Sequence, residues 1–122
     1  MRGGSSSDVK LLERVEIQIG EYLAGQRKEF SLAVHLSGTD FQLRVWEALQ
    51  EIPFGEVWSY GDVAQAIRSP RAARAVGNAV GANQHLVLVP CHRVIQGDGT
   101  LGGFGCGVDV KEFLLEIEGV RF

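Results

Sequence analysis

Cys91 and His92 are adjacent in the sequence, and they are the two side chains best suited to nucleophilic chemistry. A cysteine becomes a nucleophile when a base or a nearby cation favours its thiolate form. His92 is the only base close to Cys91 in the sequence, but neighbouring residues of an extended chain point to opposite sides. We therefore expect a water molecule to bridge the thiol and the imidazole. Such pairs also occur in purely structural settings, so the pair alone leaves both interpretations open.

The second cysteine, Cys106, lies in a glycine-rich segment from Gly97 to Gly107. Glycine is frequent where a turn needs a positive φ or where the backbone approaches another group closely. We interpret Cys106 as an inert or oxidisable loop thiol. Two cysteines are too few for a disulfide scaffold and, without companion histidine pairs, too few for a structural zinc site. The sequence therefore predicts no metal and no cofactor.

The composition is typical of one soluble globular domain: 122 residues, 45% of them hydrophobic, with a net charge of −3. No apolar run approaches the roughly 18 to 20 residues that a membrane-spanning helix needs. Residues 1–7 are polar, unlike a signal peptide, and we interpret them as a disordered lead or tag. We expect a cytoplasmic protein, or a nuclear one in a eukaryote, with no membrane partner.

Positive charge is concentrated in the middle of the chain, although the net charge is negative. Residues 63–97 contain four arginines and no acidic residue, whereas the other 87 residues contain 8 bases and 15 acids. This segment predicts a basic face suited to nucleic acid, with an ordinary solvated surface as the alternative. The four arginines are Arg68, Arg71, Arg74 and Arg93.

Local signals predict the elements that must position these side chains. A helix capped by Asp8 ends at Gly25, and alternating apolar residues then predict a short strand over 30–36. Thr39 and Gln42 form a capping-box pattern at the start of a second amphipathic helix.

Two closely spaced helices follow. Ser59 and Asp62 form another capping box for a short helix through Ile67. Ser69-Pro70 supplies the cap and first position of the next, which we expect from Arg71 to about Gly81. A helix, a short break and a second helix indicate a helix-turn-helix.

The second helix of this pair is rich in small residues, among them Ala73, Ala75 and Gly77. A helix with so little side-chain bulk can lie close against another surface, and Arg71 and Arg74 are placed to meet phosphates or bases there. The alternative is that the alanines pack tightly against the first helix.

The remaining elements surround the cysteine. An apolar strand over 86–89 leads into Pro90, Gly97-Asp98-Gly99 predicts a hairpin turn, and Asp109 begins a last helix with Glu112 in its cap. That helix is expected to turn Phe113, Leu114 and Ile117 inward. The fold class is mainly α (α+β): a winged-helix-like helix-turn-helix domain in which a short strand or hairpin carries the cysteine loop.

Several of these segments together resemble the O6-alkylguanine-DNA alkyltransferase family. The segments are Pro90-Cys91-His92-Arg93-Val94-Ile95, Gly99-Thr100-Leu101-Gly102-Gly103-Phe104, the small-residue helix from Arg71 and Gly81-Ala82-Asn83. The similarity runs from about Thr39 to Gly119 and covers the family's active-site domain. It implies three regions: a lead or tag at 1–7, a remnant of an N-terminal domain at 8–37, and the alkyltransferase domain at 38–122.

The resemblance implies an irreversible transfer of the alkyl group from O6 of guanine to Cys91, so that each molecule acts once. His92 would act through a water as the base, and Glu118 would hold its other ring nitrogen. Tyr60 would donate its hydroxyl proton toward the departing guanine.

The resemblance also implies a partner, double-stranded DNA containing O6-alkylguanine, bound by a monomer through the minor groove. Because the reactive atom lies inside the duplex, the nucleotide must rotate outward, and Arg74 would fill the gap that it leaves. The matched positions on the DNA-binding side are Arg71, Ala73, Ala75, Gly77 and Asn83, the last of which ties the helix pair to the active-site strand. Val94, Phe104 and Gly105 would line the base pocket. Phe104 stands where many members have tyrosine, and Cys106 where a small residue is usual.

Two other functions stay open at this level. An alkyltransferase-like protein would bind the damaged DNA without transfer and recruit other repair factors, but that group usually has another residue, often tryptophan, at the position of Cys91. A helix-turn-helix regulator with an incidental thiol would not require His92 and Glu118.

Overall fold

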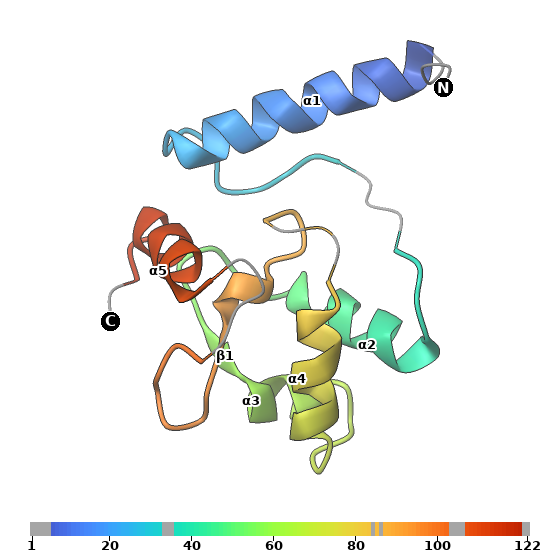
Figure 1. The fold of residues 1–122 in the computed structure, drawn as a ribbon, viewed down its shortest axis with the longest axis vertical. Coiled ribbons are helices and arrows are strands. Elements are labelled where there is room, and N and C mark those ends of the chain that lie inside the picture. The colour runs from blue at the N-terminus through green and yellow to red at the C-terminus, as the bar shows by residue number, and fades with distance from the viewer. Residues whose placement is uncertain (1–5, 33–35, 84, 86, 103–106, 121–122) are drawn as a thin grey trace. The chain divides into compact units, whose positions relative to one another are not determined.

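The computed structural model describes residues 6–32, 36–83, 85, 87–102 and 107–120 (Figure 1). The chain divides into two compact units, Met1–Ala33 and Val34–Phe122. The first contains α1 (Ser6–Leu23), which begins two residues before the predicted cap at Asp8. This helix ends as predicted, because Gly25 takes a positive φ of 78° that favours glycine.

The predicted strand over 30–36 is wrong for its described residues, which form no strand. A strand needs a neighbouring strand to satisfy its backbone groups. Here, side chains of α1 satisfy them: Gln18 Oε1 accepts the N–H of Ser31 at 3.0 Å, and Arg14 Nη2 donates to the Ser31 carbonyl at 3.2 Å. The alternation of apolar residues could not show that side chains of α1 would bind these backbone groups in place of a neighbouring strand.

In the second unit, α2 (Asp40–Leu49) and α3 (Tyr60–Ala66) begin at the predicted capping boxes. Thr39 Oγ1 accepts the N–H of Gln42 at 3.1 Å, and Gln42 Oε1 accepts the N–H of Thr39 at 3.0 Å. The same reciprocal pair of hydrogen bonds caps α3. These local bonds fix the first turn of each helix, and with it the side that each helix buries.

The next helix, α4 (Ala73–Gly81), begins two residues later than predicted. Ser69 is engaged elsewhere: its N–H donates to the carbonyl of Ala64 at 2.8 Å at the end of α3, and its own carbonyl accepts the N–H of Ala72 at 2.9 Å. Ser69 therefore belongs to the turn between the helices and does not cap α4.

The three helices pack together as predicted for a helix-turn-helix. α4 lies against both α2 and α3, and these two also touch each other. Trp46 Nε1 donates to the carbonyl of Ala79 at 2.8 Å, which ties α2 to α4 in the buried core. That core includes Val45, Leu49, Val63, Val76, Val89 and Val94.

A small parallel sheet joins the helices to the cysteine segment. β1 (Trp58–Ser59) pairs with β2 (Val94–Ile95), with Trp58 opposite Val94. The turn after β2 forms as predicted: the N–H of Gln96 donates to the carbonyl of Thr100 at 3.0 Å, and Gly99 takes a positive φ of 89°. The partner of β2 is β1, however, and not the chain beyond the turn.

The predicted apolar strand over 86–89 is wrong for its described residues. Val87 has a positive φ of 73°, and the N–H of Val89 donates to the carbonyl of His85 at 2.9 Å, so this segment is a turn. It leads directly into a short 3-10 helix, η1 (Cys91–Arg93).

The last helix, α5 (Val108–Ile117), follows Gly107 and has no side-chain hydrogen bond at its cap, so the predicted capping by Asp109 and Glu112 is wrong. Phe113, expected inside, is 54% exposed. The residues that face inward are Lys111, Leu114, Leu115 and Glu118. The first and last residues of this stripe, Lys111 and Glu118, are charged, so an interpretation based on apolar residues missed the stripe.

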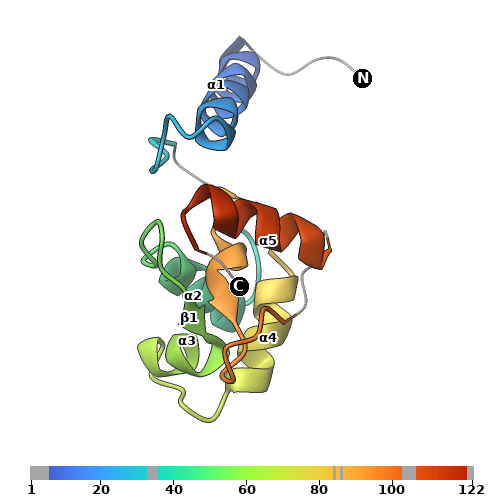
Figure 2. The ribbon, with the colours of Figure 1, turned by 90° about the vertical axis from the view of Figure 1, so that its left-hand side faces the viewer.

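In Figures 1 and 2 the segment that contains η1 and β2 lies between α5 on one side and the α2, α3 and α4 group on the other. None of the described helices is long and apolar enough to cross a membrane.

Candidate active site

The cysteine segment is a buried 3-10 turn and not an extended strand. Cys91 is 3% exposed and is not part of a disulfide, and His92 is completely buried. With about three residues per turn, successive side chains diverge by roughly 120° instead of pointing to opposite sides. Asn83 fixes the chain just before this turn, because its side-chain amide donates to the carbonyl of Val89 at 3.0 Å. Asn83 thus ties α4 to the cysteine segment, as the resemblance implied.

Glu118 meets His92 from the end of α5. The carboxylate Oε2 lies 2.8 Å from His92 Nε2, and both side chains are excluded from solvent. An ionised carboxylate only accepts hydrogen bonds, so Nε2 carries the proton and the lone pair of His92 is on Nδ1. Burial lowers the pKa of His92, against the opposing effect of Glu118. His92 is therefore neutral at neutral pH and suited to accept a proton.

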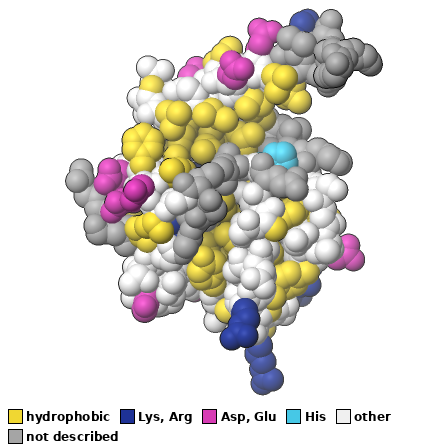
Figure 3. Space-filling model, in the orientation of Figure 1, with side chains coloured by type: hydrophobic (Ala, Val, Ile, Leu, Met, Phe, Trp, Pro, Cys, Tyr) yellow, Lys and Arg dark blue, Asp and Glu magenta, His cyan; other side chains and the backbone are white. Residues whose placement is uncertain are grey.

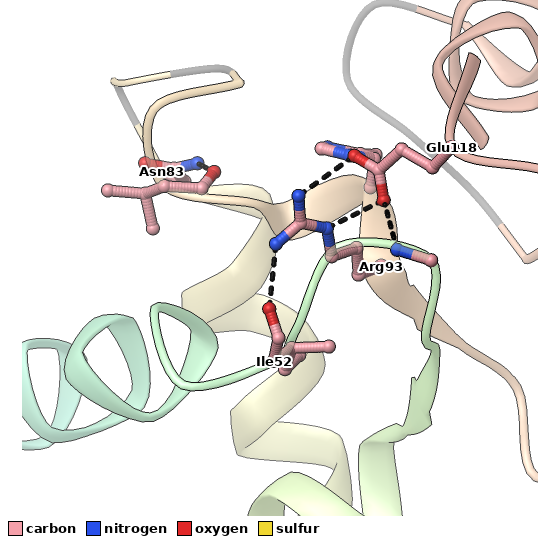
Figure 4. A network of polar contacts seen from close by, with 7 residues as sticks. Ile52, Asn83, Arg93 and Glu118 are labelled. Atoms are coloured by element: carbon pink, nitrogen blue, oxygen red, sulfur yellow. Dashed lines mark hydrogen bonds and ion pairs between the residues drawn. The ribbon is translucent and has the colours of Figure 1, made fainter. Parts of the chain in front are cut away.

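Arg93 shares the same carboxylate. Its guanidinium binds Glu118 in a bidentate pair, with Nε 2.8 Å from Oε1 and Nη2 2.9 Å from Oε2 (Figure 4). Arg93 is buried, so the sequence interpretation that placed it on a basic face is wrong. Its place two residues after Cys91, within the motif that carries the family resemblance, was the available signal of this role.

Lys111 is a site residue that the sequence interpretation missed. Its side chain is 1% exposed, and Nζ donates to the carbonyls of Val94, at 2.6 Å, and Leu101. Burial lowers the pKa of Lys111 to about 8, while the nearby Cys91 opposes this shift. The ammonium therefore lies close enough to interact with a Cys91 thiolate and to favour it. Its helical spacing from Leu114 and Glu118 was the available signal.

Tyr60, the first residue of α3, also lies near the thiol. Its ring packs beside Gly77 of α4, where an added Cβ would meet ring carbons at 3.9 Å. Burial, and then the charge of Cys91, raise the pKa of Tyr60. Its hydroxyl therefore keeps its proton at neutral pH and can serve as a hydrogen-bond donor.

Three exposed arginines lie at and around the turn between α3 and α4. Arg68, Arg71 and Arg74 are all exposed, and dark blue side chains project from the unit in Figure 3. Arg71 lies in the turn before α4 and not in the helix. Arg68 takes a positive φ of 61°, a conformation that favours glycine at the end of a helix.

The other predicted positions divide into those that the structure describes and those that it does not. On α4, Ala75 is exposed, while Ala73 and Gly77 are half-buried. Val94 is buried in β2, with its carbonyl bound by Lys111. Phe104, Gly105 and Cys106 lie outside the described residues. Within the described part of the chain, no group of three or more His, Cys, Asp or Glu residues is placed to hold a metal ion.

Comparison with known proteins identifies the family. Residues 40–120 match the model described as 6-O-methylguanine DNA methyltransferase, DNA binding domain. An inducible methylated-DNA–protein-cysteine methyltransferase of Bacillus subtilis is 50% identical over 107 residues, which make up 88% of this chain and 60% of that protein.

Solved structures show the same fold. Mycobacterium tuberculosis OGT in complex with DNA matches with a TM-score of 0.85 and 50% identity, over 86% of this chain and 64% of that one. An S. pombe protein in complex with damaged DNA containing O6-carboxymethylguanine matches with a TM-score of 0.63 and 35% identity, over 70% of this chain and 82% of that one.

Fold and site together define a helix-turn-helix domain of the α+β class with a buried thiol beside a His-Glu pair. The chain belongs to the 6-O-methylguanine DNA methyltransferase family. It spans between 60% and 65% of the length of three curated relatives that it matches, from B. subtilis, Mycolicibacterium paratuberculosis and Methanosarcina acetivorans.

Proposed function

We propose that this chain repairs O6-alkylguanine in double-stranded DNA by moving the alkyl group onto its own Cys91. The observation that carries the proposal is the buried thiol beside a neutral His92, whose Nε2 is held 2.8 Å from Glu118. The Cys91 thiolate attacks the alkyl carbon, so that an S–C bond forms while the C–O6 bond breaks and guanine leaves with the electron pair. The thioether is stable, so each molecule acts once.

The surrounding residues supply the proton transfers. His92 Nδ1 takes the thiol proton through a water, and Glu118 stabilises the resulting imidazolium. The Tyr60 hydroxyl donates a hydrogen bond to the departing guanine anion and stabilises its charge. The guanine anion then takes up a proton from water, while His92 holds the proton that came from the thiol. The positive charge of Lys111 also favours the thiolate. No cofactor enters this scheme.

The DNA contacts are assigned to the helix pair. The half-buried Ala73 and Gly77 and the exposed Ala75 leave α4 slim enough for the minor groove, which is only about 6 Å wide. Arg74 fills the stack after the damaged nucleotide rotates into the pocket, and Arg71 contacts phosphate. Little sequence preference is expected from minor-groove binding, as damage repair requires.

The same proposal assigns regions to the chain. Residues 38–122 form the DNA-binding and transfer domain and act as a monomer. Residues 6 and 7, which the sequence assigned to a disordered lead, belong to α1. Val94, Phe104 and Gly105 line the base pocket.

Mass spectrometry tests the transfer directly. After incubation with a duplex that contains one O6-methylguanine, the Cys91 peptide should gain the mass of one CH₂ group, and the recovered DNA should contain guanine. Tight binding of the modified duplex without this mass gain would instead indicate an alkyltransferase-like protein that binds without transfer.

A further inference from the structure

The Glu118 carboxylate binds more than the histidine that it orients. Oε1 accepts from Arg93 Nε at 2.8 Å and from the N–H of Gly55 at 3.3 Å, while Oε2 accepts from Arg93 Nη2 at 2.9 Å and from His92 Nε2 at 2.8 Å. His92 therefore shares its carboxylate with a guanidinium group that cannot lose its charge.

Arg93 also fixes this group in space. Its third guanidinium nitrogen, Nη1, donates to the carbonyl of Ile52 at 2.7 Å (Figure 4). The guanidinium carbon lies 5.9 Å from the centre of the Phe54 ring. One buried side chain in η1 thus connects the end of α5 with the segment between α2 and β1. Glu118 has little freedom to move away from His92.

The charges around His92 act in opposite directions. Glu118 favours the imidazolium, whereas Arg93 in η1 and Lys111 in α5 disfavour it, and burial disfavours it most strongly. Cys91 precedes His92 in η1, and Tyr60 of α3 interacts with Cys91. Without the arginine, the Glu118 carboxylate would favour the imidazolium with less opposition, and the pKa of His92 would be higher. A protonated histidine cannot accept the proton of Cys91.

We propose that Arg93 is a positioning residue for the transfer reaction: it holds the Glu118 carboxylate against Nε2 of His92, and it offsets the carboxylate charge so that His92 stays neutral before transfer. The effect of Arg93 on methyl transfer rests on the proposed function, but its effect on His92 can be measured without DNA. The Glu118 carboxylate then acts mainly by stabilising the imidazolium that forms in the transition state.

Three variants separate this role from a purely structural one. Arg93→Gln removes the charge, and Arg93→Lys keeps the charge but loses the bidentate geometry. The double variant Arg93→Gln with Glu118→Gln removes both charges and leaves no buried lone carboxylate. Lys10→Gln, an exposed change in the other unit, is the matched control.

The first measurement is the pH midpoint of the His92 ring by NMR in protein labelled with nitrogen-15. The chain has only three histidines, so substitutions of His35 and His85 assign the signals. Arg93→Gln should raise the midpoint, Arg93→Lys should raise it by less, and the double variant should return it toward that of the parent.

The second measurement is the single-turnover rate of methyl transfer to Cys91 as a function of pH. The rate of Arg93→Gln should fall about tenfold at a pH one unit below its shifted midpoint, because about a tenth of His92 is then neutral. The loss should be recovered as pH rises. If Arg93→Gln folds poorly, Arg93→Lys and the double variant give the comparison.

An unchanged His92 midpoint in folded Arg93 variants, with transfer lowered equally at every pH, would overturn the proposal and leave Arg93 a structural residue. If the parent transfers no methyl group, the proposed function fails, while the NMR midpoints still decide whether Arg93 keeps His92 neutral.

Discussion

The chemistry of the site depends on four charged or titratable side chains that the fold buries around one thiol. His92 and Glu118 were predicted from the resemblance, whereas Arg93 and Lys111 were not assigned to the site. Both missed residues are cations, and cations are normally exposed, so sequence patterns favour the surface. Only the tertiary structure shows that Arg93 is paired with Glu118 and that Lys111 is bound to two carbonyls.

The first prediction for a single residue concerns Cys91 as the acceptor of the methyl group. Cys91→Ala should abolish methyl transfer and leave binding to an O6-methylguanine duplex nearly unchanged, because the buried thiol contributes chemistry and little contact area. Transfer is measured by mass spectrometry and binding by fluorescence anisotropy. Continued demethylation by this variant would assign the acceptor role to Cys106 or another group.

Lys111 gives a prediction about stability and pH. Its folded pKa of about 8 lies below the ordinary value of 10.5, so between these pH values the unfolded chain binds more protons than the folded chain. The free energy of unfolding of the parent should therefore rise with pH across this window, relative to Lys111→Met. Urea unfolding at pH 7 and pH 10 measures the difference between the two proteins. A difference that stays constant would contradict a charged, buried Lys111.

The elements were predicted best where a local bond defines them. The capping boxes at Thr39 and Ser59 place the first turns of α2 and α3 correctly, because those bonds involve residues three apart. The start of α4 was wrong because Ser69 forms its bonds with α3 and with the turn. The strand over 86–89 was wrong because Asn83 holds this segment as a turn, a contact that alternation does not show.

The positive φ of Arg68 at the end of α3 should lower the free energy of unfolding, and this can be tested. Arg68 occupies the position after the helix where a positive φ favours glycine, and the N–H groups of Arg68 and Ser69 close the helix on Gln65 and Ala64. Arg68→Gly should raise the free energy of unfolding by up to about 1 kcal/mol, as measured by urea unfolding. It should also weaken duplex binding, since it removes one exposed positive charge. A loss of stability would show that the Arg68 side chain contributes to the fold.

Arg74 in α4 tests the proposed base rotation. Arg74→Ala should slow transfer from duplex DNA far more than transfer from free O6-methylguanine base, because only the duplex leaves a gap in the stack that needs filling. The two single-turnover rates are compared with those of the parent. Equal losses on both substrates would mean that Arg74 acts on folding or on the pocket.

At the scale of the whole molecule, the number of exposed arginines limits how many DNA phosphates the protein can neutralise. The structure lowers the number that the sequence predicted. The sequence predicted a basic face from the four arginines of residues 63–97, but Arg93 is neutralised inside the site, so three of the four are exposed: Arg68, Arg71 and Arg74. Arg44 of α2 is also exposed and donates to the carbonyl of Ile67 at the end of α3. Counting charges along the chain does not distinguish a surface arginine from a buried one. The rest of the molecule carries an excess of acidic residues, so few phosphates can be neutralised at once.

The salt dependence of duplex binding measures the number of phosphate contacts. The logarithm of the duplex binding constant should fall with the logarithm of salt concentration at a slope of about −0.9 per phosphate contact. We expect roughly two or three contacts, with modest affinity and little sequence preference. Arg71→Ala should reduce the slope by about one contact without changing which damaged base is repaired, since phosphate contacts position a protein and do not read bases. A slope near −10, as in a large repressor, would require a second basic surface or several molecules on one duplex, and the single face formed by three arginines would then be wrong.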